Sequence, residues 1–333
     1  MIEHGRRMAA QYALAIPVNL DSIATWGTVE HELGADLEVH QGGGLMVAET
    51  PAELESLRKK HALEQEAGME AELITGDQAR ALEPLLGRSV RGAEYMPSEG
   101  GANPRLAAPA FAASAARLGA DIRTHARVVG LRRDAGHWRA RLADGEELAA
   151  ETVVVASGVW SAQLLAMADV RLPLVPVALS MVVTQRTGPS VTHLIQHAGR
   201  RLSLKQARDG NVLIGGGWPS RLVQEGGQID LDATPRPLWD SISGSASTAA
   251  HVVPAVQSLD VLRVWTGITA LTVDGIPLVG AVPRRPGLFL IAAPGFVRAP
   301  TLGREMSQLI LHGKTGLPLD AYSPGRLAHL NFI

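Results

Sequence analysis

The stretch from Arg263 to Gly303 constrains the fold of this 333-residue chain more than any other. It contains a W-T-G segment, the pair Asp274-Gly275, the segment P-L-V-G leading into an apolar strand, and a glycine- and proline-containing turn before a helix expected over 300–313. Glycine lets a backbone come close to another group because it has no side chain. Glycines at these strand and helix junctions indicate that the chain holds a planar or phosphorylated group.

The rest of the chain alternates between two patterns. Helices are expected over 20–34, 51–66 and 103–119, with Thr50-Pro51 and Asn103-Pro104 as start signals. The apolar run over 152–156 predicts a strand buried on both faces, which passes through Gly158 into a helix over 160–168. Between 172 and 265, alternating residues predict an antiparallel sheet, with one helix near 235–250.

The fold class predicted from this order is α/β (α+β overall) with two discontinuous lobes. One lobe is expected to comprise 1–35, 98–170 and 264–333, and the other, sheet-rich lobe 36–97 and 171–263.

Composition excludes several kinds of site. Cysteine is absent, which excludes disulfides, cysteine-ligated zinc, and iron–sulfur clusters held by this chain. The histidines show no metal-ligand spacing, so no metal site is expected. The net charge of −2 provides no field for nucleic acid. No apolar run reaches membrane-spanning length and the N-terminus lacks a signal-peptide core, so a cytoplasmic protein is expected.

Eight sequence blocks occur in an order that resembles one known family. They are GGGLMVAET, ALEPLL, EYMPSEGGANP, the segment over 115–120, VVVASGVWS, LKQARDGNVLIGGGW, RVWTGITALTVDGIPLVG and the terminal helix. Together they resemble the glycine/D-amino-acid oxidase (DAO) family of FAD-dependent oxidoreductases. The likeness is closest to the flavin subunits of hydroxyproline, proline or opine dehydrogenases.

The resemblance implies a Rossmann-like FAD-binding lobe with an inserted antiparallel-sheet substrate lobe. It implies non-covalent FAD and oxidation of the C–N bond of a small amino or imino acid, of the hydroxyproline, proline, opine, sarcosine or glycine class. Because the chain has no cysteine, any iron–sulfur centre that accepts electrons would be held by a partner subunit.

The resemblance also assigns residues to the flavin. It places Val128 near the adenine, and the turn after the apolar strand under the diphosphate. The cofactor-binding residues that it implies are Val128, Ala156, Ser157, Gly158, Trp160, Gly267, Asp274, Gly275, Gly295, Phe296, Arg298, Thr301 and Leu302. Two of these assignments have an equally simple alternative, because Asp274-Gly275 also reads as a tight turn and VVVASG as an ordinary strand and turn.

On the substrate side, the resemblance implies that the strands over 44–47 and 204–206 face the flavin. Met46, Lys205 and Gln206 are the candidate catalytic residues. A lysine on a sheet is more often solvated, whereas burial would tune its pKa. Hydride transfer from an amine requires no dedicated acid–base pair, so the absence of a His/Asp pair is compatible with this activity.

Two positions depart from the family pattern. Arg298 and Ala299 stand where relatives are richer in glycine, so Arg298 could contact the flavin, bind a substrate carboxylate or be an exposed loop residue. Thr269 occupies the place where amino-acid oxidases often carry a carboxylate-binding arginine. This favours a cyclic imino acid or an opine over a simple α-amino acid.

The G-x-G-x-x-G turn that opens such flavoproteins is not found between Met1 and Trp26. We therefore expect a lobe that lacks its first βαβ unit, through truncation or degeneration. An alternative function follows, namely a non-catalytic relative or subunit with weak or no FAD binding. An NAD-dependent enzyme is disfavoured by the same missing turn.

Overall fold

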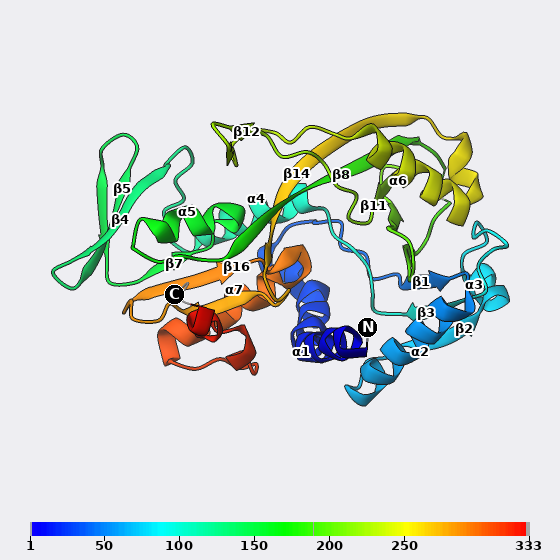
Figure 1. Ribbon diagram of the computed structural model, residues 1–333, viewed down its shortest axis with the longest axis horizontal. Coiled ribbons are helices and arrows are strands. Elements are labelled where there is room, and N and C mark those ends of the chain that lie inside the picture. Colours follow the sequence, from blue (N-terminus) through cyan, green and yellow to red (C-terminus); the bar gives the residue numbers. More distant parts are fainter. Residues whose placement is uncertain (1, 189, 331–333) are drawn as a thin grey trace. The chain divides into compact units, whose positions relative to one another are not determined.

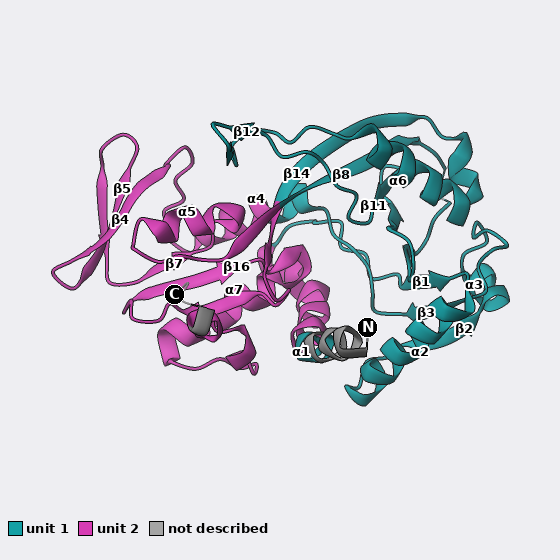
Figure 2. Cartoon of the chain, viewed as in Figure 1, with its two compact units in different colours: residues 1–16, 34–107, 177–268 teal, residues 17–33, 108–176, 269–333 magenta. Residues whose placement is uncertain are grey.

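The computed structural model describes residues 2–188 and 190–330 and divides into two compact units (Figure 2). Unit 1 comprises 1–16, 34–107 and 177–268, and unit 2 comprises 17–33, 108–176 and 269–333. The predicted sheet-rich lobe falls within unit 1 except for residues 171–176. The structure assigns 1–16, 34–35, 98–107 and 264–268 to unit 1, whereas the sequence placed them in the other lobe.

Helix α1 (Ile2–Leu33) contributes to both units, its first half to unit 1 and its second half to unit 2. The sequence predicted a helix only over 20–34, whereas the observed helix is continuous through Pro17. Proline removes one helical hydrogen bond, yet Ile16 and Val18 on either side of it are almost fully buried. Burial of these side chains favours a continuous helix. The predicted stop at Gly34 is confirmed, since its φ is +62°.

Unit 1 is built on an eight-stranded sheet with the order β14-β8-β11-β10-β9-β1-β3-β2 (Figure 1). Residues 174–176 of β8 and 269–272 of β14 fall in unit 2. Most pairs are antiparallel, as predicted, but β1 and β9 run parallel. A short hairpin of β12 and β13 lies apart from this sheet. The strands are β1 (Gly44–Ala48), β2 (Glu72–Thr75), β3 (Gly92–Met96), β8 (Leu174–Arg186), β9 (Leu194–His197), β10 (Ser203–Gln206), β11 (Asn211–Gly215), β12 (Gln224–Glu225), β13 (Gln228–Ile229) and β14 (Val261–Thr272).

The helices of unit 1 are α2 (Pro51–Glu66), α3 (Gly76–Leu82) and α6 (Trp239–Val252), followed by the short 3₁₀ helix η2 (Pro254–Ser258). The predicted capping box of Thr50 and Glu53 is confirmed at the start of α2. Helix α6 buries Ala249 and Val252 against Leu45, Val47 and Leu204, which share one face of the sheet.

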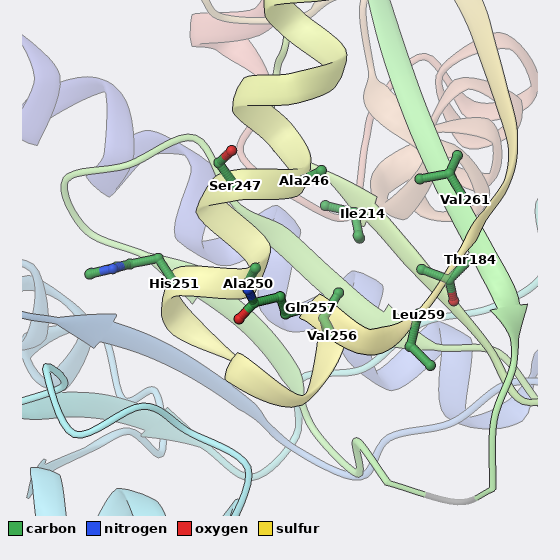
Figure 3. A pocket seen from close by; sticks show the side chains of 10 residues that line it. All are labelled: Thr184, Ile214, Ala246, Ser247, Ala250, His251, Val256, Gln257, Leu259 and Val261. Carbon is green, nitrogen blue, oxygen red and sulfur yellow. The ribbon is translucent and has the colours of Figure 1, made fainter.

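That face also carries a cavity of about 460 Å³ beside α6 (Figure 3). Thr184, Ile214 and Val261 line it from the sheet, and Ala246 and Ala250 from the helix. None of the residues predicted for the functional site lines this cavity.

A buried ionic cluster joins α1, α2 and β3 within unit 1. The Lys60 ammonium lies 2.6 Å from Glu64 Oε1 and 2.5 Å from Glu94 Oε2, and the Tyr12 hydroxyl donates to Glu64. Burial and a hydrogen bond with Glu64 raise the pKa of Glu94 to about 7, although Lys60 opposes this shift. Two buried carboxyl groups therefore share one ammonium, and Glu94 retains a proton in mildly acidic solution.

This cluster predicts a pH-dependent stability. The pKa of Glu94 is higher in the folded chain than in the unfolded chain, so the folded chain holds an extra proton between the two values. The stabilisation is complete below the unfolded pKa and is lost as pH rises through about 7. We expect the melting temperature to fall between about pH 6 and about pH 8, and this fall to be smaller in Glu94→Gln. An equal fall in both proteins, measured by calorimetry, would show that another group is responsible.

Unit 2 contains two three-stranded sheets, β15-β16-β7 and β4-β5-β6. Helix α4 begins at the predicted Asn103-Pro104 signal. The strands are β4 (Val128–Asp134), β5 (His137–Leu142), β6 (Glu147–Ala150), β7 (Val153–Val155), β15 (Leu278–Ala281) and β16 (Leu288–Ala292). The helices are α4 (Pro104–Arg117), of which 104–107 fall in unit 1, α5 (Ser161–Ala166) and α7 (Gly295–His312), with 3₁₀ helices η1 (Gly158–Trp160), η3 (Asp320–Tyr322) and η4 (Pro324–Leu330).

Two expectations for unit 2 were wrong. Strand β7 is shorter than predicted and is not buried on both faces, since Val154 is 38% exposed. The reason is that, among the described strands, β7 pairs with β16 alone and forms an edge. Helix α7 begins at Gly295 rather than at 300, so Pro300 lies inside the helix.

Candidate functional site

The start of α7 forms the first part of the candidate site, in unit 2. Gly295 has a φ of +72°, and a Cβ built on it would have no protein atom within 4 Å. The preceding residue, Pro294, provides no side-chain cap. The first N–H groups of a helix have no partner within the helix, so an uncapped end can donate to an anion.

Helix α1 holds this start in place. The Trp26 indole N–H donates to the carbonyl of Val297 at 2.7 Å, and its ring lies 4.9 Å from that of Phe296. Arg298 donates to Asn19 Oδ1 at 2.7 Å. Arg298 is therefore not a free loop cation, and the side chains at the beginning of α7 are oriented by contacts with α1.

The next turn of α7 packs inside the unit. Thr301 is fully buried and donates to Asp21 Oδ1 at 2.9 Å, while the Ser22 hydroxyl donates to Thr301 at 3.1 Å. Leu302 is fully buried in a cluster with Val18. Both side chains hold α7 against α1, and a direct cofactor contact by either stays a prediction.

A second open turn follows β7. Ala156 and Ser157 lead into Gly158, whose φ is +57° and whose missing Cβ would also meet no protein atom within 4 Å. Trp160 is 39% exposed at the end of η1. Val128 begins β4 in the other small sheet, opposite Leu142.

Asp274 has a structural partner that the sequence did not reveal. Arg326 in η4 donates to both carboxylate oxygens of Asp274, at 2.8 and 3.0 Å, and to the carbonyl of Ile276 at 2.6 Å. Burial alone would raise the pKa of Asp274, but hydrogen bonds from Arg326 and the Ile276 N–H hold it below its ordinary value. With Gly275 at a φ of +75°, the pair forms the tight turn that the sequence offered as the alternative.

The substrate-side candidates lie in unit 1. Met46 pairs across the strands with Gln196, and Gln196 pairs with Ser203, two residues before Lys205. Because side chains alternate along strands, these residues share the sheet face opposite the α6 cluster. Gly267 lies further along the sheet, on β14, and is exposed.

Gln206 does not belong to this group. It follows Lys205 directly, so it is on the α6 side of the sheet. Its side-chain oxygen accepts from the N–H groups of Ser190 and Val191, and its amide nitrogen donates to the carbonyls of Gly188 and Gly210. The amide thus fixes two loops, which is a structural role.

Lys205 on this face differs from a typical paired lysine. No hydrogen bond or ion pair engages its ammonium among the described residues, and burial lowers its pKa. A half-buried lysine without a carboxylate partner is destabilising, so a ligand that offers a negative charge would be favoured there.

Comparisons with known proteins now identify the scaffold. A family model described as "FAD dependent oxidoreductase" (DAO) matches residues 1–309. The chain belongs to this family. It is 29% identical to glycine oxidase of Geobacillus kaustophilus (strain HTA426) over 322 residues, which cover 92% of this chain and 81% of that protein. It is 25% identical over 318 residues to mitochondrial sarcosine dehydrogenase of Mus musculus, covering 90% of this chain and 34% of that protein.

Among solved structures, L-proline dehydrogenase from P. horikoshii superposes on this FAD-dependent oxidoreductase with a TM-score of 0.85. The two share 25% identity, and the superposition covers 95% of this chain and 84% of that one. The α/β fold and the oxidoreductase class predicted from the sequence blocks are therefore confirmed.

The backbone around the two open turns of this FAD-dependent oxidoreductase is suited to binding a flavin. Gly158 and Gly295 leave open backbone at two junctions of unit 2, and the start of α7 has free N–H donors. Residues 2–188 and 190–330 contain no cluster of histidine and acidic residues that could hold a metal ion. None of their helices has the length and apolar character needed to cross a membrane.

Proposed function

We propose that the chain oxidises the C–N bond of a small amino or imino acid with non-covalently bound FAD. The observation that carries this proposal is the match across both units to glycine oxidase and L-proline dehydrogenase. Unit 2 holds FAD at the turns around Gly158 and Gly295, and unit 1 holds the substrate.

FAD supplies the acceptor for the hydride that leaves the carbon bonded to nitrogen. The side chains and backbone of the protein bind and orient the flavin and the substrate. The start of α7 would hold the flavin, because its uncapped N–H groups and the positive end of the helix dipole would stabilise negative charge there. Met46 presents an apolar surface to the substrate, and Lys205 binds its carboxylate.

The proposed substrates are small amino or imino acids of the hydroxyproline, proline, opine, sarcosine or glycine class, with cyclic imino acids and opines favoured. Thr269 is exposed on β14 and offers no cation at the position where amino-acid oxidases often bind the carboxylate with arginine. We further propose a cytoplasmic location, and a partner that carries any iron–sulfur centre.

A dye-reduction screen after reconstitution with FAD tests this function. We expect proline, hydroxyproline or sarcosine to reduce the dye at least about tenfold faster than D-alanine, which is a difference of about 1.4 kcal/mol in activation free energy. Faster turnover of D-alanine would contradict the substrate class. A protein that stays colourless with added FAD would instead support the non-catalytic alternative.

A further inference from the structure

The loop after β3 approaches the same sheet face as Lys205 and contains Gly100 and Gly101. Gly101 is fixed by two reciprocal backbone hydrogen bonds with His40, both 2.8 Å long. A Cβ on Gly100 would lie only 1.8 Å from the carbonyl oxygen of His40. The loop backbone is therefore in tight contact with the segment before β1 and has little freedom to retreat.

Lys205 extends to this loop from β10. Its Nζ lies 2.9 Å, and its Cδ 3.7 Å, from the point that a Cβ on Gly101 would occupy. The φ of Gly101 is outside the left-handed region, so its backbone conformation does not itself require glycine. The ammonium of Lys205 occupies the space that any other residue at position 101 would need.

We infer that Gly101 is a positioning residue, whose missing side chain lets the Lys205 ammonium lie against the loop backbone on the substrate face of unit 1. The effect of Gly101 on catalysis rests on the proposed substrate-binding role of Lys205. The packing of Lys205 against Gly101 does not depend on that role.

A methyl group at position 101 must displace either the loop backbone or the end of the Lys205 side chain. The loop is held by His40 and resists displacement, whereas the end of a lysine side chain rotates easily. Gly101→Ala should therefore displace the ammonium rather than disrupt the fold. A displaced ammonium is better solvated, so the pKa of Lys205 should rise toward its ordinary value.

Competitive acetylation followed by mass spectrometry measures this directly on the full chain with FAD. Lys59, whose side chain is 75% exposed, is the internal reference. We expect the pH dependence of Lys205 acetylation to shift toward that of Lys59 in Gly101→Ala. Gly188→Ala is the matched control, because its Cβ would meet no atom within 4 Å and its φ is also outside the left-handed region. An unchanged Lys205 profile in Gly101→Ala would overturn the inference.

Kinetics separate this inference from the proposed function. If Lys205 binds the substrate carboxylate, Gly101→Ala should raise KM about tenfold with a smaller change in kcat, equivalent to about 1.4 kcal/mol of binding. A shifted acetylation profile with unchanged KM would support the packing role of Gly101 and contradict the substrate role of Lys205.

A double-mutant cycle covers the case in which Gly101→Ala is unstable. If the contact with Lys205 causes the loss, Gly101→Ala should cost little stability in a Lys205→Ala background. The same loss in both backgrounds would show that position 101 is crowded by other groups, and would reject the inference.

Discussion

Replacement of Lys205 by methionine is expected to lower kcat/KM for the amino or imino acid substrate by about 10- to 100-fold. The proposed charge-assisted hydrogen bond from Lys205 to the substrate carboxylate would be lost, and such a bond is worth about 1.5–3 kcal/mol. Methionine keeps an unbranched chain of similar length in the half-buried position on β10, so packing changes little. Steady-state kinetics should show most of the effect in KM.

Two further variants make this test specific. Lys205→Arg retains the charge and should recover part of the loss, although its planar group needs more room beside Gly101. Lys59→Met removes an exposed lysine on α2 and should leave kinetics unchanged. If Lys205→Met retains full kcat/KM, the carboxylate is bound elsewhere in the protein.

The second large effect is expected on stability, from Arg326→Met. The substitution would leave Asp274 largely buried without its two hydrogen bonds from the guanidinium group. Removing one partner of a fully buried ion pair costs about 3–5 kcal/mol, and because the two side chains remain 16% and 20% exposed, the loss is expected to fall below that range. Urea unfolding should show this loss as a lower midpoint at neutral pH.

The pH dependence of this pair has a definite sign. The pKa of Asp274 is lowered in the folded chain, so its stabilisation is present above the unfolded pKa and is lost as pH falls toward the folded value. Arg326→Met should therefore lose part of the acid sensitivity of the wild type. Arg326→Lys keeps a charge but cannot donate to both oxygens, and should fall between the two. Equal stability of all three proteins at neutral pH would rule out this role for the pair.

Local signals in the sequence predicted local structure well. The Thr50 capping box, the stop at Gly34 and the Asn103-Pro104 start were readable because each depends on residues within one helical turn. The eight blocks also identified the family, because their order along the chain can be recognised without knowing how the chain packs.

Side-chain roles that depend on distant partners were not readable. Arg326 is 52 residues from Asp274 in the sequence, and no pattern near either residue indicates the pair. Gln206 and Lys205 are adjacent in sequence, but the register of β10 places them on opposite faces of the sheet. Gly101 lies in the recognised block EYMPSEGGANP, yet its contact with Lys205 depends on how that block folds over the sheet.

The division of α1 between the two units suggests where the chain can be dissected. A version that starts at Pro17 would keep Asn19, Asp21, Ser22 and Trp26, and with them the described contacts that orient the start of α7. It would lose Tyr12, whose hydroxyl donates a hydrogen bond from α1 to the buried carboxylate of Glu64. Substitutions in the first half of this helix could therefore change the pH response of the ionic cluster while preserving the contacts around the turn proposed to hold the flavin.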